Sequence, residues 1–476
     1  MNNDKITVIL GAGPAGLAAG YELSKKFNQK VILIEKEPQV GGMSGTKKFS
    51  GHLIDFGPHR FFSKNKEVKD LWSEVLGPDF IEVPRLTRIF YKNKFFNYPL
   101  KIKNTLLNLG LVESGAVFFS ILSTKLKNLF SKKKDVTFED FVSRRFGNRL
   151  FSIFFKSYTE KLWGISTKEL SAQWASQRIK DLSISTILKN LLFGWRKARA
   201  VSLIEKFNYP KLGAGMMYEK ISDGIIKAGG EVVTGSEVKL IKHHDNKITS
   251  IILIDENGME KEIKGDNFIS SIPINEMINS FDPKAPKEVI DAADSLKFRS
   301  LVIVSLVVAS DKIFPDNWIY IHDPSLKVTR MQNNANWGPH LSEKDNETVL
   351  NLEYACWEND DFWSINDNNL VEIAKSDLKK IQVASNLKVF NGLVSRLPHA
   401  YPVYAFDYEN NLNLLFGFLK KFENFQTIGR SGMFHYNNMD HSILSGVYAA
   451  RNLMGENYDI LNINTDGDYH EVDSEK

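Results

Sequence analysis

The sequence predicts an α/β protein with a discontinuous domain built on a parallel sheet, a mainly helical insertion and a β-rich second domain. Three observations lead to this prediction. Residues 5–10 are a short β-branched run that leads directly into a glycine-rich turn and a helical pattern. Similar buried runs recur far along the chain, at 267–272 and 425–428. Between them lie one largely helical stretch and one stretch of strand-like segments.

The first strand ends in a G-x-G-x-x-G motif made by Gly11, Gly13 and Gly16. Gly11 permits the tight turn, Gly13 lets the backbone approach a pyrophosphate, and Gly16 allows close packing of helix on strand. The N–H groups at the start of the following helix point at that pyrophosphate. A second strand at 31–35 ends in Glu35, where a carboxylate can bind both ribose hydroxyls. Strand, glycines, helix and acid together predict a Rossmann-like dinucleotide site.

Two features favour FAD as the dinucleotide. The acid at position 35 would repel the 2′-phosphate of NADP. A second glycine turn follows at 40–44 and includes Gly42 and Met43. This arrangement resembles the FAD-binding opening of the amine oxidase and protoporphyrinogen oxidase group. The resemblance implies that the second turn passes close to the diphosphate and ring of the flavin. The sequence has no recognisable covalent attachment motif, so we expect the flavin to be bound non-covalently.

The same patterns predict how the chain is divided. We expect the FAD-binding domain to consist of three segments, 1–65, 209–298 and 385–460. A mainly helical insertion at 66–208 lies between the first two, and a β-sheet substrate domain at 299–384 lies between the last two. Residues 461–476 form a C-terminal tail. Within the second FAD-binding segment, the predicted strand at 237–241 places Val238 at the cofactor.

The individual elements follow from periodicity and from cap residues. Apolar residues recur at helical spacing from Val68 to Leu76, and Gly77 ends that helix. Thr137 and Asp140 resemble a capping box that begins another helix. Alternating residues predict a hairpin through Asn257 and Gly258. The remaining predictions are strands at 300–309, 318–322 and 348–357, an amphipathic helix at 367–382, and a helix that begins at 437–440.

Composition excludes several classes of function. The net charge of +4 is too balanced for a protein that tracks nucleic-acid phosphates. Cys356 is the only cysteine in the sequence, so we expect no intramolecular disulfide, no multi-cysteine metal site and a reducing, cytoplasmic location. No metal-ligand spacing is present. The longest apolar run, 300–309, is far shorter than the roughly 20 residues that a membrane helix needs.

A basic stretch follows the apolar residues 117–122 and contains five lysines, Lys125, Lys127, Lys132, Lys133 and Lys134. Such a run is most often a solvated helix end and loop. The alternative is peripheral contact with a membrane surface or with an anionic lipid carrier.

Several segments, in order, resemble UDP-galactopyranose mutase and its relatives among the protoporphyrinogen-oxidase-like flavoproteins. They are residues 55–59, 94–100, 154–164, 329–332, 353–354 and 429–440. The resemblance spans the chain from Lys5 to Gly455, and the segment 154–164 is its most specific match. It implies a flavoenzyme whose substrate is a nucleoside-diphosphate sugar.

The resemblance also assigns roles to single residues. It implies that His59 lies near the flavin ring, that Arg430 and the helix N-terminus at Asp440 face the flavin, and that Gly429 belongs to the same cofactor site. For the substrate it implies pocket or phosphate contacts by Tyr158, Trp163, Arg330, Tyr354 and Tyr436, with His59, Arg330 and Trp163 as the catalytic set. The alternatives are core positions for the aromatic residues and surface ion pairs for the arginines.

The chain departs from the mutase pattern at three places. Arg60, Phe61 and Phe62 stand where the mutases have a second histidine. Arg178, the nearest candidate for their second diphosphate arginine, is out of step, and Ala355 replaces a proline after Tyr354. The flavin half of the site is therefore more completely matched than the nucleotide-sugar half.

These observations leave two main hypotheses of function. The first is a mutase that interconverts pyranose and furanose rings through reduced FAD, in a pathway such as cell-surface polysaccharide biosynthesis, with NAD(P)H or another donor as reductant. The second is an FAD-dependent oxidoreductase that acts on an amine, a porphyrinogen, a polyene or a glycan-linked substrate. A third is an FAD-binding protein without turnover. We expect no nucleic-acid partner, and a homodimer stays open.

Overall fold

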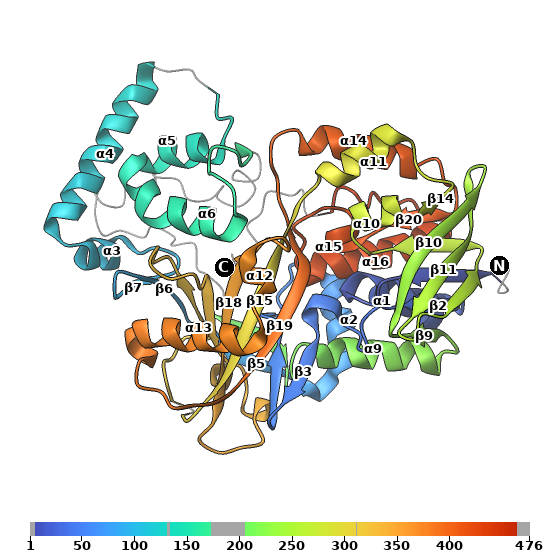
Figure 1. Cartoon of the computed structure of the whole chain (residues 1–476), viewed down its shortest axis with the longest axis horizontal. Helices are drawn as coiled ribbons and strands as arrows, with labels where there is room; N and C mark the ends of the chain where they lie inside the picture. The colour runs from blue at the N-terminus through green and yellow to red at the C-terminus, as the bar shows by residue number, and fades with distance from the viewer. Residues whose placement is uncertain (1–4, 131–133, 173–204, 311, 464–476) are drawn as a thin grey trace.

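The computed structural model describes residues 5–130, 134–172, 205–310 and 312–463. Figure 1 shows three parts: a sheet covered by helices α1, α9 and α16, a second sheet beside it, and a helical lobe at the upper left. The expected α/β architecture is confirmed.

The first part is a five-stranded sheet in which all neighbouring strands are parallel. Its order is β20 (Phe425–Thr427), β13 (Asn267–Ser270), β1 (Ile6–Leu10), β2 (Lys30–Ile34) and β9 (Glu231–Val233). The predicted strands at 5–10, 31–35, 267–272 and 425–428 are therefore confirmed. Because the strands are parallel, their carboxyl ends meet at one edge, where the glycine turns follow.

Close helix packing places the turns at this edge. Helix α1 (Pro14–Tyr21) packs on α16 (Met439–Leu453), and both share a core with α9 (Gly215–Lys227) and α2 (Lys66–Leu76). A Cβ at Gly16 would lie 1.9 Å from the Gly11 carbonyl oxygen, and one at Gly446 would lie 2.1 Å from that of Ala15. Both positions therefore require glycine. Gly77 ends α2 as predicted, but α2 packs in the nucleotide-domain core and not in the helical lobe.

A four-stranded sheet lies next to the parallel sheet and contains the predicted hairpin. Its order is β12 (Glu260–Lys264), β11 (Lys247–Asp255), β10 (Ser236–His244) and β14 (Phe281–Asp282). A buried core joins this sheet to α10 (Ile274–Asn279), α11 (Lys287–Ser295) and α14 (Tyr408–Leu419).

The second large sheet has seven strands and includes the three predicted strands between 300 and 357. Its order is β19 (Val389–Pro402), β15 (Phe298–Val308), β18 (Thr348–Cys356), β17 (Arg330–Asn333), β16 (Trp318–Ile321), β6 (Thr87–Tyr91) and β7 (Lys94–Asn97). The expected amphipathic helix is α13 (Asp367–Lys380), and it covers one face together with α12 (Asp361–Ser364).

Strands from outside the segment 299–384 complete this sheet, which differs from the expected division. The strand β15 is buried at every residue, so its backbone groups need partners on both sides. The strand β19 supplies one side, although 385–460 was assigned to the FAD-binding domain. The strands β6 and β7 come from the expected helical insertion, and a further strand there, β5 (Phe80–Pro84), pairs with β8 (Lys206–Pro210).

The helical lobe consists of α3 (Ile102–Leu109), α4 (Leu111–Phe130), α5 (Phe138–Phe151) and α6 (Ser157–Trp163). The predicted capping box is present. Thr137 Oγ1 accepts from the Asp140 N–H at 2.9 Å, and the Asp140 carboxylate accepts from the Thr137 N–H at 3.1 Å. Within the described residues, no helix is long and apolar enough to cross a membrane.

Candidate functional site

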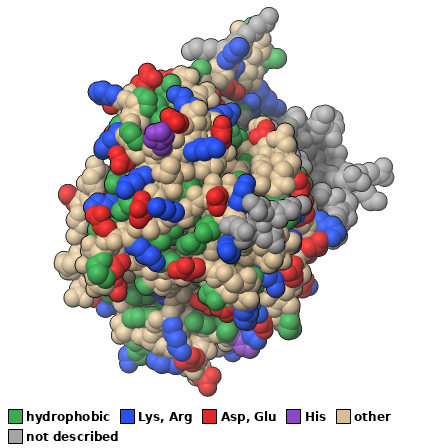
Figure 2. Space-filling view, turned by 90° about the vertical axis from the view of Figure 1, so that its right-hand side faces the viewer, with side chains coloured by type: hydrophobic (Ala, Val, Ile, Leu, Met, Phe, Trp, Pro, Cys, Tyr) green, Lys and Arg blue, Asp and Glu red, His purple; other side chains and the backbone are tan. Residues whose placement is uncertain are grey.

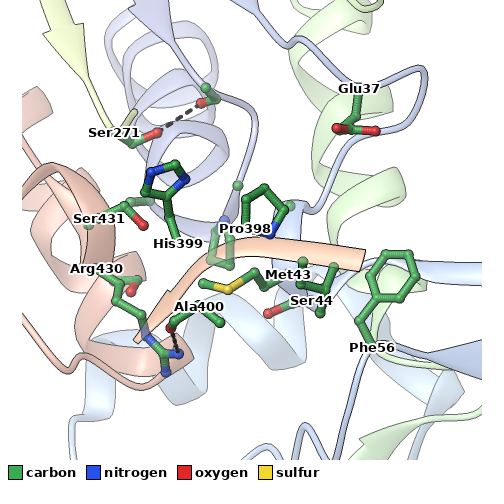
Figure 3. A pocket seen from close by; sticks show the side chains of 18 of the residues that line it. Glu37, Met43, Ser44, Phe56, Ser271, Pro398, His399, Ala400, Arg430 and Ser431 are labelled. Carbon is green, nitrogen blue, oxygen red and sulfur yellow. Dashed lines mark hydrogen bonds between the residues drawn. The ribbon is translucent and has the colours of Figure 1, made fainter. Parts of the chain in front are cut away.

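A cavity of about 740 Å³ begins at the two glycine turns and ends against β19. Figure 3 shows its inner part, where Met43 and Pro398 lie between Arg430 and Glu37. Twelve of the predicted residues line it together: Gly11, Gly13, Glu35, Gly42, Met43, His59, Val238, Arg330, Gly429, Arg430, Tyr436 and Asp440.

The glycine end of the cavity has the form of an anion cradle. Gly13 is the N-cap of α1, no side chain caps the helix, and its first turn carries no acid. A Cβ at Gly13 would meet nothing within 4 Å, so open space lies against the backbone there. The second turn rests directly on the first, because Gly41 N–H donates to the Ala12 carbonyl at 2.8 Å. These features fit the pyrophosphate of a dinucleotide.

Glu35 lies at the carboxyl end of β2, beside this cradle. One carboxylate oxygen accepts from the Ala12 N–H at 2.7 Å, and the other accepts from the Glu37 N–H at 3.0 Å. Burial raises the pKa of Glu35, while these two hydrogen bonds lower it. The carboxylate is thereby held at the cavity wall, in the place where ribose hydroxyls are bound in such folds.

Arg430 joins three segments of the cavity wall. Its Nε donates to the Asn437 carbonyl at 2.8 Å, and its Nη1 donates to the Ala400 carbonyl at 3.1 Å, the dashed contact in Figure 3. The guanidinium lies 5.0 Å from the centre of the Tyr436 ring. Arg430 therefore joins α15 (Gly429–Gly432) to β19 and to the loop before α16.

His59 is held in its neutral form. Burial and, to a lesser extent, the nearby cations Arg430 and Arg330 together lower its pKa to about 3. Its Nδ1 is buried and has no hydrogen-bond partner among the described residues. A buried polar atom without a hydrogen-bond partner beside a cavity fits a site in which a bound ligand supplies the missing hydrogen bond.

Arg330 forms a two-bonded ion pair with the buried Glu353. Nε donates to one carboxylate oxygen at 2.9 Å, and Nη2 donates to the other at 2.6 Å. A Cβ at Gly57 would lie 3.3 Å from this carboxylate, so glycine, with a φ of +116°, keeps the space that the pair occupies. The charge of Arg330 is largely neutralised before any ligand binds.

Three predicted substrate residues do not line the cavity. Trp163 is buried behind its wall, with its ring 5.8 Å from that of Tyr436. Tyr158 stacks on His322, with ring centres 4.3 Å apart. Tyr354 is a core residue on the α13 side of the sheet, where its hydroxyl lies 3.3 Å from Asp377. The core alternative therefore describes Tyr354. Gly16 packs inside α1, and Arg178 lies outside the described residues.

Tyr401 is a wall residue that the sequence analysis missed. It lies on β19, stacks on Tyr436 with ring centres 5.4 Å apart, and has Arg430 5.7 Å from its ring. Burial raises its pKa. No motif marks this tyrosine. Only the pairing of β19 with β15 brings it to the cavity.

The fold and the cavity define an α/β protein that binds a dinucleotide and that has further space lined by arginines and tyrosines. Residues 14–454 match the family model for flavin containing amine oxidoreductases, and the chain belongs to this family. The protein is accordingly an FAD-dependent enzyme, and the residues at the glycine cradle fit this cofactor.

The proteins that this chain resembles include an oxidase and sugar-nucleotide mutases. Coproporphyrinogen III oxidase of Bacillus subtilis (strain 168) is 22% identical over 79% of this chain and 83% of its own length. A protein of Klebsiella pneumoniae named probable UDP-galactopyranose mutase is 28% identical over 47% of this chain and 54% of its own. The solved structure of reduced UDP-galactopyranose mutase superposes with a TM-score of 0.82, covering 98% and 97% of the two chains at 19% identity.

Proposed function

We propose that the protein is a mutase that interconverts the pyranose and furanose forms of a nucleoside-diphosphate sugar with reduced FAD. The observation that carries the proposal is the group of Arg330, Arg430 and the stacked Tyr401–Tyr436 pair at one end of the FAD cavity. Arginine binds phosphate oxygens with paired hydrogen bonds, and stacked tyrosines form an amphipathic wall for a nucleotide or sugar. The likeness to the Klebsiella protein and to the mutase structure supports it.

In this proposal each residue has a defined task. Reduced FAD would supply the nucleophile for the anomeric carbon. Arg430 and Arg330 stabilise the charge of the departing diphosphate. The neutral His59 donates or accepts a hydrogen bond at the sugar or flavin without a competing charge. Tyr401 and Tyr436 hold the substrate in place and keep water away.

The test is an anaerobic incubation of dithionite-reduced enzyme with UDP-, GDP- and TDP-sugars, followed by chromatography. We expect a ring-size isomer from one of them, with reduced but not with oxidised enzyme. Tyr436→Phe should weaken binding of that sugar nucleotide about tenfold, as expected for one lost hydrogen bond. Tyr354→Phe is the matched control, because Tyr354 lies outside the cavity, and its affinity should not change.

An oxidoreductase is the second candidate, and the Arg330–Glu353 pair favours it. A carboxylate bonded to both arms of Arg330 weakens the attraction for a diphosphate. The coproporphyrinogen oxidase relative also covers more of this chain than the mutase relative does. Stoichiometric reduction of FAD by a porphyrinogen or an amine, with no sugar isomer formed, would replace the mutase proposal with this one.

A further inference from the structure

Helix α4 has an apolar face that points away from the rest of the protein. In Figure 1 the helix forms the outer edge of the helical lobe. Phe119 is 70% exposed, Leu129 77% and Phe130 90%. The same face carries further exposed apolar side chains, Leu111, Val112, Leu122 and Leu126. Helical spacing places these residues together, because 111, 122, 126 and 129 recur at intervals of three, four or eleven.

The face of α4 that contacts the protein combines several polar groups with two apolar residues, Val117 and Ile121. The Glu113 carboxylate is bonded to Arg149, with one contact at 2.8 Å, and the Arg149 N–H donates to Ser120 Oγ at 3.0 Å. Asn128 donates to the Arg144 carbonyl at 2.8 Å. A surface helix ordinarily buries its apolar side and exposes its polar side. In α4 most of the large apolar side chains instead face outward, and the helix is held in place by these polar contacts together with Val117 and Ile121, which pack against the core.

Among the described residues of α4, lysines border the apolar face and no acid does. Lys125 and Lys127 are exposed and lie on its two opposite edges. Lys101, Lys103 and Lys134 are exposed near the two ends of the lobe. The single acid of α4, Glu113, is bound to Arg149 on the inner side. By contrast, Figure 2 shows charges of both signs interspersed over another face of the molecule.

We propose that α4 is a docking helix for an anionic membrane surface, where it lies in the plane of the headgroups. Its outward face would enter the boundary of the acyl chains, while the lysine stems extend along it and place their ammonium groups at lipid phosphates. The helix has 20 residues and is therefore about 30 Å long, and Leu107 on the preceding helix α3 is exposed as well. This inference goes beyond the proposed reaction and does not depend on it.

Charge selects a bilayer over a second copy of the chain. A symmetric contact through this face would place Lys125 and Lys127 of both copies at its edge, with no acid on the outward side of α4 to compensate them. Anionic headgroups supply that missing negative charge at every position around the helix.

The test is flotation of the full-length, FAD-loaded protein with vesicles. One set of vesicles is phosphatidylcholine alone, and the other contains equal parts of phosphatidylcholine and phosphatidylglycerol. We expect binding to the anionic vesicles that weakens as salt is added. Lys125→Gln with Lys127→Gln should lower the partition coefficient about twenty-five-fold, since each cation near such a surface contributes a factor of about five.

A second variant tests the apolar face. Phe119→Ser with Leu126→Ser should lower the partition coefficient at least about tenfold. Ile226→Ser with Met259→Ser is the matched control, because these side chains are comparably exposed on other elements, and its binding should equal that of the native protein. Flavin absorbance and the melting temperature verify that every variant is folded.

Two results would overturn the proposal. One is the absence of vesicle binding by the native protein at low salt. The other is a dimer, seen by analytical ultracentrifugation without lipid, that the Phe119→Ser/Leu126→Ser variant loses while vesicle binding is unaffected by either α4 variant. That second result would assign the face to contact between copies.

Discussion

At the scale of single residues, Gly13 shows how a missing side chain prepares a binding site. Its φ of −75° and ψ of −177° are accessible to any residue, so the backbone does not require glycine there. What glycine preserves is the open space against the helix N-terminus, where a Cβ would meet nothing within 4 Å. The residue is therefore needed for the cofactor and not for folding.

We predict that Gly13→Val gives a folded but colourless protein. The valine side chain would occupy the space of the FAD pyrophosphate. The affinity for FAD should therefore fall at least about a hundredfold, which corresponds to a loss of at least about 2.8 kcal/mol in binding free energy. Titration with FAD and the flavin spectrum measure this loss. Gly417→Val, which also adds its Cβ to open space but on α14, should remain yellow. A yellow Gly13→Val protein with native affinity contradicts the assignment.

The Arg330–Glu353 pair makes a second prediction at this scale. Arg330→Ala leaves the Glu353 carboxylate buried without its partner, which should lower the free energy of unfolding by about 3–5 kcal/mol. Adding Glu353→Gln should recover most of this loss, because a neutral amide is less costly to bury. Urea denaturation of the single and double variants gives the coupling. If the losses of unfolding free energy in the two single variants simply add in the double variant, Arg330 and Glu353 do not stabilise the protein as a pair.

At the scale of elements, contacts between backbones decide where the site residues stand. The helices α1 and α16 approach so closely that Gly446 faces the Ala15 carbonyl. This approach sets the N-terminus of α16, with Asp440, beside that of α1. Both helix N-termini thus border one cavity. The N–H groups of α1, which has no side-chain cap and no acid in its first turn, favour a negatively charged ligand, whereas the first turn of α16 carries Asp440.

Gly446→Ala should therefore damage both stability and cofactor binding. The added methyl group would lie 2.1 Å from the Ala15 carbonyl oxygen and would push the helices apart, at a cost of about 1–3 kcal/mol in unfolding free energy. FAD affinity should fall as well, because α16 would shift. In Gly417→Ala the same change meets open space and should stabilise the protein by up to about 1 kcal/mol. Equal effects of the two substitutions would exclude this packing argument.

At the scale of the whole molecule, buried histidines link stability to pH. Burial lowers the pKa of His59 and of His322 to about 3, and it also lowers the pKa of His52 and His435. The unfolded chain titrates such groups near 6.5, so it binds more protons than the folded protein between about pH 6.5 and pH 3. Their contribution to stability is therefore constant above about pH 6.5 and is lost as the pH falls below it.

His322→Phe should make the protein less sensitive to acid. The ring keeps its place against Tyr158, but the proton that the unfolded state would take up at this position is gone. The slope of unfolding free energy against pH between about pH 6 and pH 4 should decrease by up to about 1.4 kcal/mol per pH unit. Urea denaturation across this range measures the slope. The exposed His244 offers the control, since His244→Gln should leave it unchanged.

Sequence alone determined the features that depend on neighbouring residues. The strand, glycine turn and helix at 6–21, the capping box at Thr137 and the hairpin at 247–264 each form from local chemistry, and the structure has all of them. The family membership is likewise found from the sequence alone, through the match of residues 14–454 to the family model.

Only the tertiary structure decided which residues share the cavity. Glu353 and Tyr354 are adjacent on β18, and successive side chains of a strand point to opposite faces. One therefore meets Arg330 and the other enters the core beneath α13. Tyr401 reaches the wall because β19 pairs with β15, about 100 residues earlier in the chain. Alternation along a strand shows which residues share a face, but the pairing of distant strands decides what that face meets.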